Sequence, residues 1–553
     1  MDNHSRHMTR PKELLLEYHE RSKHHVNRYA PGPRNLDWET QPNPFREFRD
    51  ALQIELPIAA DNLRTRYNNI RRGNLPPPHA FDLRNLATLF ELSFGLSAWK
   101  TYGSSRWALR CNPSSGNLHP TEAWIVHDGR VCHYAPREHG LEERCLFESP
   151  AARTLKVRAT DDDYFLVALT SIIWREAWKY GERAFRYCQH DVGHAIGSLR
   201  FAAALLGWRL SLLPEWSDAQ IAALLGLDRD EDYDDAEREE PECVALVSAS
   251  PGFGIRDSGL DPTALVAAVR AGGWSGRANR LSSERVEWPL IDEVAAATRY
   301  PGPATFEPQT REPRTPNPPI PDPRSAIPDS GSQYRARPII LQRRSALSFD
   351  ARGVLERETF IRMLGRLQPF APPWDAIYWP PHVHLVLFVH RVRDLTPGVY
   401  AYLREPALLD EWRAAMRAEF MWEAVTTSTG KPTSLFLLVP IDARRIANRL
   451  SCDQDIAEDG FFGLAMIARF AQPLRQHGDW FYRRLFWECG LIGQLLYLEA
   501  EAAGARSTGI GCYYDDPVHE LLGLSGNEWQ SLYHFSMGSP IEDTRLTTEA
   551  IGW

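Results

Sequence analysis

The segment RCNPSSGNLHPTEAWIV, residues 110–126, combines side chains that could bind a ligand with the start of a buried strand. Its polar corner consists of Pro113, Ser114, Ser115, Gly116 and Asn117. Proline restricts the backbone, so Pro113 and Pro120 would hold hydroxyl and amide groups in a fixed arrangement. An ordinary strand-entry turn has the same composition, and the residues by themselves leave both interpretations open.

The second half of the chain carries a different set of polar residues. The set comprises Arg343, Arg344 and Ser345 in LQRRSALSFD, and Gly509, Ile510 and Gly511 in STGIGCYYDD. Guanidinium groups bind phosphates and other acceptors through paired, charge-assisted hydrogen bonds. A Gly-x-Gly turn lets the main chain approach a ligand closely. For the arginines, the alternative is a solvated basic run at the start of a helix.

A lysine and a tyrosine, Lys179 and Tyr180, precede a long helical pattern in WKYGERAFRY. A lysine that is desolvated near a ring system can lose its proton near neutral pH and act as a general base, with Tyr180 orienting the substrate or sharing the proton. The alternative is a surface lysine beside a packed tyrosine. His190 and His194 have helical i, i+4 spacing, but no third ligand is evident nearby, so we predict no metal site.

Composition limits the classes of function. The chain of 553 residues has 63 basic and 72 acidic residues, and its net charge of -9 argues against a general nucleic-acid or anionic-membrane surface. The eight cysteines show no C-x-x-C spacing, which is typical of buried thiols in a reducing compartment. No stretch approaches the roughly 18 apolar residues of a membrane span. We therefore predict a cytoplasmic protein. No P-loop or Rossmann motif occurs, which argues against a nicotinamide-binding domain.

An internal repeat determines the predicted architecture. Residues 185–207 align without a gap on residues 482–504, an offset of 297, and each segment predicts a long helix that ends near its glycine. Short strand patterns precede the helices: AWIV and YFLVAL in the first half, HLVLFV and SLFLLV in the second. We predict the α+β class, with an N-terminal extension (1–80), a first domain (81–275), a Pro-rich linker (276–335) and a second domain (336–553).

The two copies of the repeat differ at every polar element. The offset of 297 places Gln476 opposite Lys179 and Pro214, which has no N–H to donate, opposite Gly511. The matching positions also lack a counterpart of the corner PSSGN and of the segment RRS. Each candidate element occurs in only one of the two copies. A site built from both halves would therefore have its full set of residues at one position and lack them at the equivalent position.

Together these motifs resemble the FMN-dependent nitroreductase superfamily. NPSSGNLHPTE and WKYGERAFRY are most similar to its SagB-type and McbC-type dehydrogenases, which oxidise azoline rings in ribosomal peptides. In that family two subunits interlock, with each flavin at their interface. The resemblance implies two tandem nitroreductase-like domains that form an intramolecular pseudo-dimer, with one complete and one degenerate FMN site. It assigns residues 113–117 to the first domain's share of the complete site, and residues 343–345 and 509–511 to the second domain's share.

The resemblance also implies a reaction. FMN would be the cofactor of a dehydrogenase or oxidase, with C–H deprotonation by Lys179, assistance by Tyr180, hydride transfer to flavin N5 and reoxidation by oxygen. The substrate would be a thiazoline or oxazoline in a peptide or peptide-derived natural product, and a biosynthetic protein would be a further partner. Two alternatives stay open: an NAD(P)H-dependent nitro or ene reductase, and a catalytically inactive scaffold that binds a peptide or a protein. The fused domain pair is compatible with a monomer.

Overall fold

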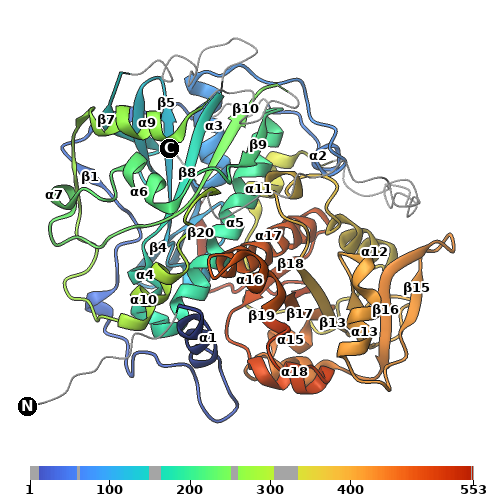
Figure 1. The fold of residues 1–553 in the computed structure, drawn as a ribbon. Coiled ribbons are helices and arrows are strands. Elements are labelled where there is room, and N and C mark those ends of the chain that lie inside the picture. The colour runs from blue at the N-terminus through green and yellow to red at the C-terminus, as the bar shows by residue number, and fades with distance from the viewer. Residues whose placement is uncertain are drawn as a thin grey trace, which may run out of the picture.

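The computed structural model describes residues 11–58, 63–148, 164–250, 260–303, 334–549 and 551. It shows two α+β domains packed against each other, the first coloured blue to green and the second yellow to red (Figure 1). Within the described residues, no helix is long and apolar enough to cross a membrane.

Each domain is built on one antiparallel sheet. The strand order is β11-β7-β6-β5-β8-β10-β9 in the first sheet and β15-β16-β14-β13-β17-β19-β18 in the second. The two orders become the same once β5 is matched with β13 and β8 with β17. The predicted α+β class and the internal pseudo-dimer are therefore confirmed.

The predicted strand patterns all lie in these sheets. The first sheet contains β5 (Thr121–His127), β6 (Arg130–Ala135), β7 (Gly140–Leu146), β8 (Tyr164–Ser171), β9 (Arg209–Leu212), β10 (Glu240–Ser248) and β11 (Gly273–Trp274), and β2 (Leu52–Glu55) also pairs with β7. The second contains β13 (Val383–Val389), β14 (Gly398–Tyr402), β15 (Glu423–Thr426), β16 (Pro432–Pro440), β17 (Phe462–Arg469), β18 (Arg506–Ile510) and β19 (Trp529–Gly538). The central strands β5, β8 and β13 are buried along their whole length, because both faces of each sheet are covered.

Helices surround the sheets. Those of the first half are α1 (Pro11–Arg21), α2 (Tyr67–Arg71), α3 (Leu83–Ser93), α4 (Ile173–Tyr180), α5 (Ala184–Leu205), α6 (Asp218–Leu225), α7 (Asp230–Tyr233), α9 (Pro262–Arg270) and α10 (Pro289–Ala297). Those of the second half are α11 (Ala336–Gln342), α12 (Arg357–Arg366), α13 (Leu409–Ala415), α14 (Arg444–Leu450), α15 (Ile456–Asp459), α16 (Ala471–His477), α17 (Phe481–Ala502) and α18 (Asp515–Leu522).

The two long predicted helices, α5 and α17, are confirmed and pack against each other at the domain interface (Figure 1). They cross at Gly193 and Gly490, which the offset of 297 makes equivalent; a Cβ on either glycine would collide with the backbone of the other helix. Each helix is followed by a glycine with positive φ, Gly207 at 74° and Gly504 at 71°. The glycine pair at the crossing thus lets equivalent helices meet on the pseudo-two-fold axis.

Equivalent ion pairs join the domains on the two sides of this axis. Arg186 on α5 contacts Asp515 at 2.7 Å, and its counterpart Arg483 on α17 lies 3.7 Å from Asp218. Both arginines are buried and hold a carboxylate at the start of the other domain's helix, α18 or α6. The agreement of Arg186 with Arg483 across the repeat, visible in the sequence, therefore reflects a structural role.

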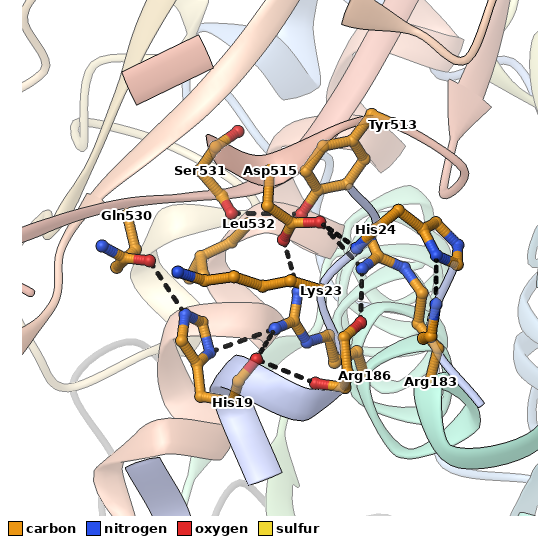
Figure 2. A network of polar contacts seen from close by, with 12 residues as sticks. His19, Lys23, His24, Arg183, Arg186, Tyr513, Asp515, Gln530, Ser531 and Leu532 are labelled. Carbon is orange, nitrogen blue, oxygen red and sulfur yellow. Dashed lines mark hydrogen bonds and ion pairs between the residues drawn. The ribbon is translucent and has the colours of Figure 1, made fainter. Parts of the chain in front are cut away.

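The N-terminal segment belongs to this pseudo-symmetry. After α1, the backbone N–H of His24 donates to the Asp515 carboxylate at 3.0 Å, and Asp515 N–H donates back to the His24 carbonyl at 3.1 Å (Figure 2). Figure 2 shows the network around Asp515, in which Arg183 and Arg186 approach the same carboxylate. The region predicted as an extension, residues 1–80, thus contributes a helix to the domain interface.

The same contacts recur at α10. After this helix, Tyr300 N–H donates to the Asp218 carboxylate at 2.9 Å, and Asp218 N–H donates to the Tyr300 carbonyl at 3.0 Å. Helix α10 is therefore the second repeat's counterpart of α1, and it packs against α1. The linker predicted at 276–335 begins too early, because its described part contains this helix; residues 304–333 lie outside the described residues.

The chain also crosses between the domains at its C-terminal end. Strand β20 (Thr547–Glu549) pairs with β3 (Leu96–Tyr102) of the first half, which pairs in turn with β4 (Ser105–Arg110). A further short ladder joins β1 (Phe48–Arg49) to β12 (Arg277–Ala278). The pairing of β20 with β3 thus brings a segment of the second half beside the β3–β4 hairpin, after which the polar corner begins.

Candidate active site

A cavity of about 440 Å³ lies where the two domains meet. Its wall includes Pro113, Ser114, Ser115, Gly116, Asn117 and Tyr180 from the first half, and Arg343, Arg344, Ser345, Gly509, Ile510 and Gly511 from the second. Segments that are about 160 to 400 residues apart in the sequence thus come together, as the resemblance implied. Lys179, by contrast, does not line the cavity.

The corner at 113–117 is rigid because its polar groups bind one another. The Ser114 hydroxyl oxygen accepts from the backbone N–H of His119 at 2.8 Å, and the Asn117 side-chain amide donates to the Ala108 carbonyl at 2.9 Å. Gly116 and Asn117 have positive φ values of 58° and 60°, the region that favours glycine and asparagine. This turn chemistry explains the sequence PSSGN and fixes the shape of the cavity wall.

An acidic residue from α5, Asp191, holds the corner in place. Its carboxylate accepts from the Ser115 backbone N–H at 3.1 Å and from the Ser115 hydroxyl at 3.1 Å, and it also lines the cavity. Burial raises the pKa of Asp191 to about 7, although these hydrogen bonds and one from Ser114 oppose the shift. Burial also raises the pKa of the neighbouring Glu176 well above its usual value, and the charge of Asp191 adds to that shift. Sequence reasoning missed both acids, because a single carboxyl on a helix forms no motif.

The arginines join the second domain to the loop after β4. Arg343 donates through Nε to the Cys111 carbonyl and through Nη2 to the Arg110 carbonyl, both at 3.1 Å. Its guanidinium group lies over the Tyr497 ring, 5.1 Å from the centroid. Arg344 donates through Nη2 to the Ser97 carbonyl at 3.0 Å. Part of the role of this pair is therefore structural.

The same arginines make this side of the cavity electropositive. Within the described residues, neither Arg343 nor Arg344 forms an ion pair with a carboxylate through its guanidinium group. Burial lowers the pKa of Arg344 to about 10, and the charge of Arg343 contributes to the shift. Burial lowers the pKa of Lys100, on the same wall, as well. An anion bound here would compensate these charges.

Three tyrosines pack on the glycines of the wall. If Gly116 carried a Cβ, that atom would lie 2.5 Å from the Tyr180 hydroxyl. A Cβ on Gly511 would lie 2.5 Å from the Tyr187 ring, and a Cβ on Gly509 would collide with the Tyr533 hydroxyl. The predicted Gly-x-Gly turn is instead the end of strand β18, and close packing within the protein requires glycine at positions 509 and 511. All three tyrosines line the cavity and offer it ring surface and hydroxyl groups.

Lys179 and Tyr180 end helix α4, and Gly181 follows with a positive φ of 55°. The pKa of Tyr180 lies well above its usual value, because the hydroxyl is buried and Glu176 is near. Tyr180 therefore stays protonated and can donate a hydrogen bond into the cavity. The half-buried Lys179 has its ammonium group 5.3 Å from the centre of the Tyr180 ring.

The histidines of α5 are hydrogen-bonded within the protein. His190 Nε2 lies 2.9 Å from the Leu532 carbonyl, and His194 Nε2 lies 3.3 Å from the Tyr533 hydroxyl. Burial lowers the pKa of both rings, so both are neutral. Among the described residues, potential metal ligands gather only at Glu20, His25 and Asp516, where the Lys23 ammonium group already pairs with both carboxylates.

The position related to the cavity by the pseudo-two-fold axis is nearly filled. It retains about 10 Å³, and its wall includes Leu212 and Leu213, which are equivalent to Gly509 and Ile510. The other wall residues are Trp216, Ile221, Glu242, Cys243, Val244, Tyr378, Arg484 and Trp487. We call this position the collapsed site; it corresponds to the degenerate site that the resemblance implied.

Comparison with known proteins agrees with this duplicated architecture. The sequence model of the nitroreductase family matches residues 100–234 and 340–539, which include most of both sheets and both long helices. The chain belongs to the nitroreductase family. No curated protein matches this nitroreductase-family chain.

A solved structure shares the fold of nearly the whole chain, and two others match parts of it with low TM-scores. A putative nitroreductase from Anabaena variabilis ATCC 29413 is 21% identical, with a TM-score of 0.67, and the match covers 96% of this chain and 99% of that one. The E. coli microcin synthetase McbBCD complex with truncated pro-MccB17 bound is 16% identical over 36% of this chain and 70% of that one, with a TM-score of 0.26. The FMN- and NADPH-dependent nitroreductase NfnB from Sphigopyxis sp. strain HMH is 20% identical over 37% of this chain and 89% of that one, with a TM-score of 0.20. The Anabaena protein thus shares the whole tandem arrangement of this nitroreductase-family oxidoreductase fold.

Proposed function

We propose that the cavity binds FMN and that the protein is an FMN-dependent dehydrogenase or oxidase. One observation carries the proposal: the corner at 113–117, the arginines at 343–344 and the end of β18 at 509–511 line a single cavity. Its volume of about 440 Å³ is typical of sites for small ligands and cofactors. Membership of the nitroreductase family supports flavin chemistry in this position.

The donor groups of the cavity fit FMN. Arg343, Arg344 and Lys100 bring positive charge to one side of it, and a dianionic phosphate would satisfy that charge. The hydroxyl and amide groups of the corner at 113–117 would face the acceptor-rich edge of the ring, and the tyrosine rings would contact its plane. When bound, FMN would supply a two-electron acceptor for the oxidation of a C–H bond.

The chain's own residues would manage the proton of this oxidation. Tyr180, protonated and on the wall, would donate a hydrogen bond to the substrate and orient it. We propose that Lys179, acting as an amine, takes the substrate proton while Tyr180 assists through its hydrogen bond to the substrate, since the side-chain nitrogen of Lys179 lies beside the Tyr180 ring. Because Lys179 is off the wall, its side chain must turn toward the cavity when the substrate binds.

The substrate that we propose is an azoline-type ring in a peptide or peptide-derived natural product, with oxygen as the electron acceptor. The similarity of NPSSGNLHPTE and WKYGERAFRY to SagB-type and McbC-type dehydrogenases supports it. A biosynthetic partner protein would then deliver the peptide. Reduction of the bound flavin by NAD(P)H alone, without oxygen, would instead favour a nitro or ene reductase.

The first experiment is an absorption spectrum of the purified protein, followed by identification of the released cofactor. We expect a flavin spectrum and FMN at one equivalent per chain, because the collapsed site has no room for a second. A colourless protein that takes up no added FMN would contradict the proposal and would favour a non-catalytic scaffold. A flavin-loaded protein that removes no hydrogen from an azoline peptide in air, as followed by mass, would contradict the substrate alone.

The phosphate side of the cavity can be tested separately. Arg344→Ala should weaken FMN binding by about 10- to 100-fold, since a hydrogen bond to a charged group contributes about 1.5–3 kcal/mol. Arg352→Ala is the matched control, because that guanidinium group is 90% exposed and pairs only with nearby Asp350. Equal FMN dissociation constants for the two variants, measured by quenching of flavin fluorescence, would show that the anion lies elsewhere.

A further inference from the structure

Two cysteines lie at the edge of the cavity. Cys512 lies just after strand β18 and lines the cavity wall, and its thiol interacts electrostatically with the thiol of Cys452. Both residues are partly exposed. The other six cysteines are buried: Cys111, Cys132, Cys145, Cys188, Cys243 and Cys489.

The backbone holds the two cysteines in register. The Gln454 side-chain amide donates to the Cys512 carbonyl at 2.9 Å and to the Ser451 carbonyl at 2.7 Å, so it bridges the two segments. The Tyr514 N–H donates to the Leu450 carbonyl at 2.9 Å, on the other side of the pair. Cys452 itself has a φ of 54°, in the left-handed region that cysteine rarely adopts. These contacts hold the two segments that carry the thiols side by side.

The surroundings favour a thiolate at Cys512. The hydrogen bond from Cys452 lowers the pKa of Cys512, burial opposes this shift, and the Arg183 charge favours it. Arg183 is fixed beside this segment, because it donates to the Gly511 carbonyl at 3.1 and 3.3 Å and to the Asp515 carboxylate at 3.0 Å (Figure 2). The same hydrogen bond, together with burial, raises the pKa of Cys452, which therefore keeps its proton.

We propose that Cys512 and Cys452 form a peroxide-responsive pair, with Cys512 as the reacting thiol and Cys452 as the resolving thiol. The Cys512 thiolate attacks one oxygen of a hydroperoxide, the O–O bond breaks, and a sulfenic acid and one water or alcohol result. The Cys452 sulfur then attacks the Cys512 sulfur, the S–O bond breaks, and a disulfide and a second water result. Over both steps, two thiols lose two electrons and two protons while the hydroperoxide is reduced.

The pair lies at the cavity in which the proposed oxidase reaction takes place. An oxidase that returns electrons to oxygen generates hydrogen peroxide in the cavity itself, so the source of the oxidant rests on the proposed function. The disulfide would tie the 451–454 segment to the cavity wall at residue 512 and would reduce the freedom of the loop that carries Gly511. We infer that the pair protects the oxidase from its own product and restrains it when peroxide accumulates.

Added hydrogen peroxide tests the chemistry, whether or not flavin is bound. The reduced full-length protein is treated with hydrogen peroxide and then with iodoacetamide, digested, and examined by mass spectrometry. We expect a Cys452–Cys512 cross-linked peptide that dithiothreitol removes. Free, alkylated Cys452 and Cys512 after this treatment, in a folded protein, would overturn the proposal. Failure to bind FMN would instead contradict the proposed function and leave this result unaffected.

Two variants assign the roles of the pair. Cys452→Ala should let the Cys512 sulfenic acid persist long enough for trapping by dimedone, and it should slow alkylation of Cys512 near pH 7 by about tenfold per unit of pKa restored. Cys512→Ala should leave Cys452 unreactive toward peroxide. Cys145→Ala is the matched control, since Cys145 is buried in the first domain away from the cavity. Sulfenic acid at Cys452 rather than at Cys512 would reverse the assignment and overturn it.

Discussion

The cavity and the collapsed site occupy equivalent positions, yet their volumes are about 440 Å³ and about 10 Å³. In the collapsed site, Arg484 stands where the cavity has Tyr187, and its guanidinium group stacks on the Trp487 ring at 3.8 Å from the centroid. Pro214 stands where the cavity has Gly511. Rings and a flat cation thus fill the space that a ligand would take. Duplication within one chain allows one copy to keep an open pocket while the other is used for packing.

A buried carboxylate shows the same contrast. Glu488, the counterpart of Asp191 on α17, accepts from two backbone N–H groups at the start of β13 and pairs with the Arg404 guanidinium group. Asp191 accepts hydrogen bonds from Ser115, but within the described residues no cation pairs with it. The position equivalent to Asp191 therefore has a paired carboxylate, whereas the cavity keeps a carboxyl that titrates near neutral pH.

The largest expected effect on stability concerns the buried ion pairs that both sides of the pseudo-two-fold axis have. Arg483→Met should lower the free energy of unfolding by about 3–5 kcal/mol, because it removes the partner of buried carboxylates, and Arg186→Met should lower it less, because Arg183 still pairs with Asp515 at 3.0 Å. Arg483→Met should be the more damaging, since Arg483 also pairs with Glu240 at 3.0 Å and Glu242 at 3.1 Å. Urea denaturation measures both values, with Arg352→Met as an exposed control. A loss below about 1 kcal/mol in either variant would show that the pairs do not hold the domains together.

A pH-dependent difference should follow from Asp191. Its pKa is about 7 in the folded protein against 3.8 ordinarily, so its contribution to stability is complete below about pH 4 and is lost as the pH rises through 7. Asp191→Asn should remove this dependence, and the stability of the wild type relative to the variant should fall by up to about 4 kcal/mol between pH 4 and pH 8. Urea titrations at both pH values measure it. A constant difference would mean that Asp191 is ionised throughout.

Much of the fold was accessible from the sequence, for identifiable reasons. The helices α5 and α17 were predicted almost to the residue, because their apolar positions recur at helical spacing and each ends before a glycine. The cavity wall was predicted only through the family resemblance, since no periodicity links residues 113–117 to Arg343 or to Gly509.

Other features left no usable signal. Helices α1 and α10 are equivalent, but His24 and Tyr300 are related by an offset of 276 rather than 297, so the repeat alignment cannot find them. Cys452 and Cys512 lie sixty positions apart without a motif, and only the fold brings their thiols together. Contacts of single residues across long separations depend on the packing of the whole chain, which local pattern does not encode.

Exchanging equivalent residues between the two sites should have an intermediate effect. Gly511→Pro introduces the residue of the collapsed site, and its side chain would press on the Tyr187 ring, where a Cβ has only 2.5 Å. We expect a loss of about 1–3 kcal/mol in stability from overpacking, together with poor retention of FMN. Pro214→Gly is the reciprocal control and should leave FMN retention unchanged. Both are measured from thermal unfolding and from the flavin released per chain; equal FMN retention in the two variants would contradict the asymmetry.

The smallest effect on binding and stability is expected at the residue that lies off the wall. Lys179→Gln introduces the residue found at the equivalent position, Gln476. Because Lys179 does not line the cavity, stability should change by less than about 0.5 kcal/mol and FMN affinity should stay the same. Substrate oxidation should nevertheless fall by more than about 100-fold if Lys179 turns inward to take the proton. Tyr180→Phe separates the alternatives, since it removes a hydroxyl that does line the cavity. If Tyr180→Phe oxidises the substrate slowly while Lys179→Gln is fully active, proton transfer depends on Tyr180 and Lys179 is a surface residue without a role in it.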